Sequence, residues 1–127
     1  EAVIVDAGVN LVPTAYWYDH GVNAASNRDL HAALGAKPVA VFGPLCMQVD
    51  ILRERAVLPT MSLGSPLVIS NVGAYCITQS MQFIQPRPAV ALIGPNGVEE
   101  IRRRETRSDI FGMDRIPARL KAKGAKF

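Results

Sequence analysis

Short apolar runs, each bounded by glycine, proline or another turn-forming residue, dominate the hydrophobic pattern of this chain. Such runs, when rich in Val and Ile, are typical of strands. They predict strands at Val3–Val5, Pro38–Phe42, Leu67–Val72, Ala89–Ile93 and Val98–Arg103. The sequence Gly-Pro-Asn-Gly at 94–97 predicts a hairpin turn between the last two. This pattern favours a mostly β fold, a sandwich or barrel-like sheet domain with a few short helices.

The segments between these strands carry weaker signals. We expect the aromatic stretch Leu11–Tyr18 to be extended, because Pro13 disfavours a helix interior. The segment Val49–Leu58 is mixed, and its Asp50, Arg53, Glu54 and Arg55 are expected to lie on an exposed stretch. Short helices are predicted at Ser26–Leu34, which Gly35 would close, at Cys76–Phe83 and at Thr106–Phe111.

The composition indicates one globular domain. The chain has 127 residues, of which 49% are hydrophobic, and a mean hydropathy of +0.14. Apolar content on this scale in a small domain favours a surface covered by another domain or subunit. The net charge of +3 is too small to indicate a nucleic-acid partner. No apolar run approaches the roughly 20 residues that span a membrane. We expect a domain over 3–112, followed by a basic, solvated tail over 113–127.

Cysteine and histidine usage further narrows the chemistry. Cys46 and Cys76 form neither a CxxC pair nor a disulfide framework, so a reducing, cytoplasmic setting is expected. With His20 and His31 as the only histidines, no metal site is predicted. The motifs GxSxG, GxGxxG, HExxH and the P-loop are absent. The chain begins without Met and enters a strand at once, which we interpret as a cut from a longer protein.

Two segments place reactive side chains beside glycine at the end of an apolar run. They are Gly43–Asp50, with sequence GPLCMQVD, and Gly73–Tyr75, with sequence GAY. Such positions suggest a site at the rim of a sheet. Each residue also has a plainer interpretation. Cys46 could be a small buried apolar residue and Asp50 a surface carboxylate. Tyr75 could be a strand-end aromatic, His20 a loop histidine bonded to backbone, and Cys76 a structural core residue.

The order of the segments is more specific than any one of them. A strand ending in DAG is followed by YWYDH, GPLC with Asp50, GAY, a hairpin and a short helix. This order resembles the C-terminal sheet domain of the pyridoxal phosphate-dependent ornithine, arginine and diaminopimelate decarboxylases, of the alanine racemase fold type. The resemblance runs from Val3 to Ile110.

The resemblance implies a site shared with other parts of an enzyme. It implies an amino-acid substrate, a homodimer, and pyridoxal 5'-phosphate held by a lysine of a separate α/β barrel. Cys46 matches a catalytic cysteine that delivers a proton to the substrate α-carbon after carbon dioxide leaves. Tyr75, with Gly73 and Ala74, matches the segment that approaches the cofactor phosphate. The remaining matches are Asp19, Tyr16 and Met47 on the substrate side, and Asp50 and His20 as supporting residues.

Two positions depart from the family pattern. Relatives acting on basic amino acids carry an acid directly after the cysteine, where this chain has Met47. Diaminopimelate-type relatives carry an arginine before the proline of the first loop, where this chain has Val12. We therefore expect a substrate other than plain lysine, ornithine or diaminopimelate, such as a siderophore or natural-product intermediate with a neutral side-chain end.

The chain alone is not expected to form a competent site. None of its lysines, Lys37, Lys121, Lys123 and Lys126, follows a buried strand as the cofactor lysine should. Two alternatives stay open. One is a non-catalytic relative that serves as a binding or regulatory module, although retention of both Cys46 and Tyr75 weighs against it. The other is an unrelated stand-alone β-barrel, which predicts a buried and inert Cys46.

Overall fold

The structure is a computed structural model, and it describes residues 1–25, 35–83 and 85–121. It forms two compact units, Glu1–Ile84 and Gln85–Phe127. Sheet dominates both units, with a few short helices, which confirms the mostly β fold class. In the described part of the chain the sheets are small and do not close into a barrel. The helix predicted at Ser26–Leu34 lies outside the described residues.

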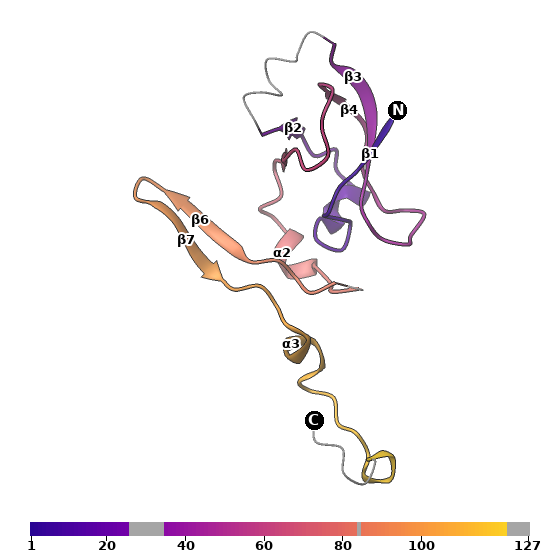
Figure 1. The fold of residues 1–127 in the computed structure, drawn as a ribbon, viewed down its shortest axis with the longest axis vertical. Helices are drawn as coiled ribbons and strands as arrows, with labels where there is room; N and C mark the ends of the chain where they lie inside the picture. Colours follow the sequence, from indigo (N-terminus) through magenta and orange to yellow (C-terminus); the bar gives the residue numbers. More distant parts are fainter. Residues whose placement is uncertain (26–34, 84, 122–127) are drawn as a thin grey trace. The chain divides into compact units, whose positions relative to one another are not determined.

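A three-stranded sheet forms the centre of the first unit. Its strands are β1 (Ala2–Ile4), β3 (Lys37–Phe42) and β4 (Ile51–Leu58), in the order β1-β3-β4. β1 lies parallel to β3, and β4 runs antiparallel to β3, as Figure 1 shows. The expected strands at Val3–Val5 and Pro38–Phe42 are thus present, with bounds shifted by one residue.

A second small sheet and two short helices complete this unit. β2 (Val22–Ala24) pairs antiparallel with β5 (Leu67–Ile69). The expected helix after Gly73 is present but short, as α2 (Cys76–Gln79). The core lies between the sheets and the first loops. Its buried apolar residues are Val9, Val12, Val22, Val39, Val41, Leu45, Leu52, Ala56, Leu58 and Cys76.

Two expectations for this unit are wrong, the second only in part. Leu11–Tyr18 is not extended throughout, because it contains the 3-10 helix η1 (Pro13–Tyr16), with Pro13 in its first turn. An N–H at that position has no intrahelical partner anyway, so proline is tolerated there. The exposed stretch expected for Asp50, Arg53, Glu54 and Arg55 is present only in part, because Asp50 is buried and Arg53 is half-buried. The segment Val49–Leu58 contains β4, the longest strand of the described chain, whose Leu52, Ala56 and Leu58 are buried in the core, whereas Glu54 and Arg55 are exposed.

The second unit contains the predicted hairpin and terminal helix. β6 (Val90–Gly94) and β7 (Gly97–Arg102) pair antiparallel, and Gly97 has φ of +117° in the turn. Glycine adopts this backbone region at little cost. α3 (Arg107–Phe111) follows, and a 3-10 helix η2 (Ala118–Leu120) lies in the expected basic tail. No helix in the described ranges is long and apolar enough to cross a membrane.

Candidate functional site

The Cys46 loop is fastened to the core by the carboxylate of Asp50. This carboxylate is buried, and its two oxygens accept N–H bonds from Val9 at 2.8 Å and Leu45 at 2.7 Å. The backbone closes the same loop, since the N–H of Gly43 donates to the carbonyl of Asp50 at 2.9 Å. The interpretation of Asp50 as a surface carboxylate is therefore wrong. Its side chain ties the β1–η1 loop to the β3–β4 loop.

Two glycines make room for this carboxylate. A Cβ at Gly8 would lie 2.7 Å from an Asp50 oxygen, and a Cβ at Gly43 would overlap the carboxylate even more closely. Real Cβ atoms are not found so near to other atoms, so side chains at these positions would displace Asp50. The Asp-Ala-Gly and Gly-Pro-Leu-Cys segments thus meet on one side chain.

The hydrogen bonds of Asp50 hold the loop in a conformation that leaves the Cys46 thiol at the surface. Cys46 is an exposed free cysteine, so its interpretation as a buried apolar residue is wrong. Its neighbour Met47 is partly buried and packs against the core. Val12, the other position that departs from the family pattern, is itself a buried core residue.

A second group of predicted residues lines one pocket of about 380 Å³. Asp19, His20, Ala74 and Tyr75 all line it. Tyr75 directly precedes α2, has φ of +65°, and is 61% exposed. A Cβ at Gly73 would meet none of the described atoms within 4 Å, so nothing in this part of the chain requires glycine there. The pocket therefore collects residues from the η1–β2 loop and the β5–α2 loop.

His20 is a buried residue of this pocket's lining and takes part in a chain of hydrogen bonds with Thr14, which also lines the pocket. Its Nε2 lies 2.7 Å from Thr14 Oγ1, and its Nδ1 lies 3.3 Å from the carbonyl oxygen of Ser70. The backbone contact expected for a loop histidine is thus present. Thr14 Oγ1 also lies 2.9 Å from Sγ of Cys76, which is buried as expected for a structural cysteine.

An aromatic groove of about 790 Å³ lies between η1 and the start of β4 and holds Tyr16. Asp19 lines both this groove and the Tyr75 pocket. Its carboxylate forms an ion pair with Arg53 of β4 at 2.9 Å and stays largely exposed. An exposed pair of this kind is weak, so the carboxylate can exchange Arg53 for another cation.

The predicted residues therefore form two groups. Asp19, His20, Ala74 and Tyr75 share a pocket, and Tyr16 lies in the adjoining groove. Cys46 and Met47 line neither. Sequence reasoning missed three participants: Thr14 at the centre of the buried network, Arg53 opposite Asp19, and Asn71, which lines the Tyr75 pocket with φ of +62°. Nothing in the local sequence distinguished them from ordinary surface or turn residues.

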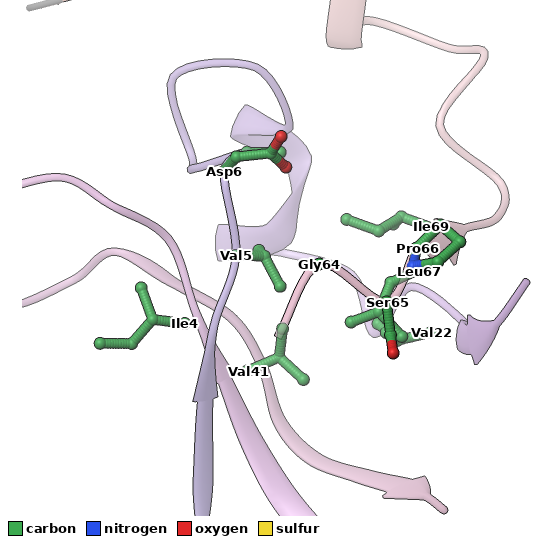
Figure 2. Close-up of a pocket in the computed structure, with 11 residues that line it drawn as sticks. Ile4, Val5, Asp6, Val22, Val41, Gly64, Ser65, Pro66, Leu67 and Ile69 are labelled. Carbon is green, nitrogen blue, oxygen red and sulfur yellow. The ribbon is translucent and has the colours of Figure 1, made fainter. Parts of the chain in front are cut away.

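A further pocket of about 490 Å³ holds none of the predicted site residues (Figure 2). Ile4, Val5 and Val41 line one side, and Val22, Leu67 and Ile69 are among the residues on the other. Asp6 is its one charged lining residue in the described chain. The same described ranges contain no group of three or more side chains suited to a metal ion.

The fold and these loops define a class of protein. The family model for the pyridoxal-dependent decarboxylase C-terminal sheet domain matches residues 1–73, more than half of the chain. The chain therefore belongs to the family of pyridoxal-dependent decarboxylases, as a C-terminal sheet domain. This confirms the resemblance seen in the sequence and makes the unrelated β-barrel alternative wrong.

Several relatives of this chain are diaminopimelate decarboxylases. The enzyme of Methanothermobacter thermautotrophicus is 36% identical over 119 residues, which cover 91% of this chain and 27% of that protein. A crystal structure of the Methanocaldococcus jannaschii enzyme in co-complex with L-lysine has a TM-score of 0.81 and 29% identity, covering 94% of this chain and 27% of the other. The Helicobacter pylori enzyme complexed with L-lysine has a TM-score of 0.76 and 28% identity, covering 88% and 27%. The chain thus spans about a quarter of the length of these relatives.

Proposed function

We propose that this chain closes the active site of a pyridoxal phosphate-dependent amino-acid decarboxylase whose α/β barrel lies elsewhere in the enzyme. The observation that carries the proposal is the family match over residues 1–73, which includes the whole Cys46 loop. The relatives extend the similarity through the Gly-Ala-Tyr segment to about nine-tenths of the chain.

The Tyr75 hydroxyl fits the phosphate end of the cofactor. A phenol hydroxyl donates well to phosphate oxygens, and Tyr75 is exposed on a pocket wall. Neither lysine in the described ranges fits its covalent attachment, since Lys37 pairs with Glu1 at 3.8 Å at the surface and Lys121 is exposed. When bound, pyridoxal phosphate supplies the electron sink for loss of the carboxylate. This chain would then supply positioning and a proton.

Cys46 would hold that proton. A thiol at the tip of a loop reaches substrate only if the loop keeps its shape, and Asp50 bonds the N–H of the preceding residue. Proton transfer from a positioned side chain typically contributes about 10²–10⁴-fold to a rate. Asp50 therefore acts through Cys46 and has no direct contact with substrate in this proposal.

The separation of the Cys46 loop from the Tyr75 pocket supports a homodimer. Cys46 lies outside the pocket that holds Tyr75 and Asp19. In a symmetric dimer, one subunit can supply Cys46 and its partner Tyr75 to the same site. The exposed Cys46 loop and the aromatic groove beside η1 would then face the partner.

We propose a diaminopimelate-like amino acid as the first candidate substrate. The named relatives support it, and they weigh against the expectation of an unusual substrate. Asp19 would contact an ammonium group. A second candidate is an amino acid with a neutral side-chain end, because Met47 and Val12 pack in or against the core and carry no charge.

The test uses the full-length enzyme. Bound pyridoxal phosphate is followed by its visible absorbance, and carbon dioxide release is measured with diaminopimelate, lysine, ornithine and Nε-acetyl-lysine. We expect cofactor binding, and a kcat for Cys46→Ala lowered about 10²–10⁴-fold with unchanged cofactor affinity. Full activity of Cys46→Ala would refute the assigned proton donor. Failure to bind the cofactor would favour a non-catalytic binding or regulatory module.

The same assay separates the two substrates. Selective turnover of diaminopimelate supports the first candidate, and selective turnover of the acetylated amino acid supports the second. With Met47→Glu, the second candidate predicts a gain in turnover of lysine and ornithine relative to Nε-acetyl-lysine. The matched control is Met61→Glu, which makes the same substitution at another methionine that packs against the core and lines none of the three pockets.

A further inference from the structure

Three buried polar residues lie beside the exposed residues of the Tyr75 pocket. Thr14, His20 and Cys76 are each at most 4% exposed. His20 directly follows Asp19, and Cys76 directly follows Tyr75. Asp19 and Tyr75 are therefore each bonded, through one peptide unit, to a buried residue of the same hydrogen-bond network.

The donor and acceptor roles in this chain follow from its chemistry. A carbonyl oxygen only accepts, so Nδ1 of His20 donates to the carbonyl of Ser70 at 3.3 Å. In the neutral ring Nε2 then accepts, and it receives the hydroxyl hydrogen of Thr14 at 2.7 Å. With that hydrogen used, Thr14 Oγ1 can only accept from the thiol of Cys76, at 2.9 Å. For a neutral His20 ring, these roles give every bond in the chain one direction.

Thr14 lies at the centre of this network, and hydrogen bonds hold both its backbone and its side chain. Its carbonyl accepts N–H bonds from Trp17 at 3.0 Å and Tyr18 at 2.9 Å, which fix it in η1. Its hydroxyl contacts one residue of the η1–β2 loop and the first residue of α2. Residues of the η1–β2 loop and of the segment that leads into α2 both line the pocket that holds Asp19 and Tyr75.

We propose that Thr14 is a positioning residue, whose hydroxyl sets the spacing between the Asp19 segment and the Tyr75 segment. Through that spacing it aligns the Tyr75 hydroxyl with the cofactor phosphate, a consequence that rests on the proposed function. Valine has nearly the shape of threonine but lacks the hydroxyl. It would leave both His20 Nε2 and the Cys76 thiol without their partner.

The test compares Thr14→Val with Thr14→Ser in the full-length enzyme. Serine keeps the hydroxyl and should rescue the effect. The control, Thr60→Val, makes the same chemical change at an exposed position after β4 that lines none of the three pockets. Three quantities are measured: the affinity for pyridoxal phosphate, KM against kcat, and NMR signals of ¹⁵N-labelled His20 and fluorotyrosine-labelled Tyr75.

We expect Thr14→Val to weaken cofactor affinity by about 10- to 100-fold, the range known for hydrogen-bond partners that orient metal ligands. Thr14→Ser and Thr60→Val should stay within about threefold of wild type on the same scale. Wild-type His20 should show the Nδ1–H tautomer, and Thr14→Val should shift the signals of both His20 and Tyr75. Should Thr14→Val fail to fold, Cys76→Ala severs the same link to α2, and we expect the same direction of change, with Cys76→Ser restoring it.

Two results would overturn the inference. One is a Thr14→Val enzyme with wild-type cofactor affinity and an unshifted Tyr75 signal. The other is an equal loss in Thr14→Val and Thr14→Ser, which would mean that side-chain volume and not the hydroxyl matters. A wild-type enzyme that binds no cofactor overturns the proposed function instead, and the His20 and Tyr75 signals then still decide whether Thr14 sets the spacing.

Discussion

At the scale of single residues, the carboxylate of Asp50 accepts N–H bonds from two loops that are far apart in sequence. Bonds to a charged acceptor are stronger than neutral ones, and a buried donor that loses its acceptor is costly. The geometry of the Cys46 loop therefore depends on a residue four positions away and on room provided by Gly8 and Gly43.

Replacing Asp50 by Asn tests this dependence. One oxygen becomes an NH₂ group that faces an N–H donor, so one of the two bonds is lost. We expect the local opening free energy at Val9 and Leu45 to fall by about 1.5–3 kcal/mol, measured by native-state hydrogen exchange. The control Glu54→Gln, an exposed carboxylate on β4, should change it by no more than about 0.5 kcal/mol. Equal protection of the Val9 and Leu45 amides from exchange in the two variants would contradict this role of Asp50.

The ion pair of Asp19 and Arg53 yields a second prediction at this scale. Because the Asp19 side chain is largely exposed, the pair should add little stability. If Asp19 contacts a substrate ammonium as proposed above, Arg53→Met frees its carboxylate for that contact, and KM should fall about two- to fivefold while kcat is unchanged. Steady-state kinetics of the full-length enzyme measure this. Arg55→Met removes an exposed arginine from the same strand and should leave KM unaltered. A lower KM in Arg55→Met would mean that loss of any positive charge on β4 lowers KM, without a specific role for the Asp19–Arg53 pair.

At the scale of elements, the start of α3 depends on one carboxylate. Asp109 accepts two bonds from the Arg103 guanidinium and two from the N–H and hydroxyl of Thr106, all at 2.7 Å. A carboxylate at this position satisfies a helix N-terminal N–H that has no partner within the helix. A helix of this length would not persist without such bonds.

These bonds predict a pH dependence. The Arg103 guanidinium, and then the Thr106 donors, hold the pKa of Asp109 well below its ordinary value. Because the pKa of Asp109 is lower in the folded state than in the unfolded state, its bonds stabilise α3 fully above the unfolded-state pKa of about 3.9. This stabilisation is lost as the pH falls below that value. NMR signals of α3 should therefore show fraying in acid. Asp109→Asn should fray at neutral pH, unlike Asp114→Asn, just beyond the helix. An acid-insensitive α3 in the wild type would contradict this.

At the scale of the whole molecule, large apolar side chains stay exposed in both units. Ile4, Trp17 and Val57 are examples in the first unit, and Ile93 and Val98 in the second. The chain spans about a quarter of the length of its relatives, and residues of this kind are expected to be covered in a longer enzyme.

This exposure predicts different behaviour for the isolated chain and the full-length enzyme. The isolated chain should bind a hydrophobic dye and self-associate with increasing concentration. The full-length enzyme should do neither, apart from forming the homodimer proposed above. Dye fluorescence and light scattering after size-exclusion chromatography measure this. A monomeric isolated chain that binds no dye would show that the barrel is not needed to cover these residues.

Elements whose formation depends on residues close together in the sequence could be predicted, and the burial of β4, which depends on more distant residues, could not. The hairpin at 94–97 was predictable because Gly-Pro-Asn-Gly dictates a turn by itself. The terminal helix was predictable for the same reason, since Thr106 and Asp109 are three residues apart. β4 was missed because burial of Leu52, Ala56 and Leu58 comes from pairing with β3, which the charged residues between them concealed.

The sequence by itself determined the family, since the order of the Asp-Ala-Gly, Gly-Pro-Leu-Cys and Gly-Ala-Tyr segments is local information that survives without coordinates. Only the tertiary structure decided which residues meet. It placed Asp50 between two loops, Arg53 against Asp19, and the Thr14 hydroxyl between His20 and Cys76. Such contacts join residues up to 62 positions apart. They depend on how the sheets and loops pack, which no spacing within a single segment encodes.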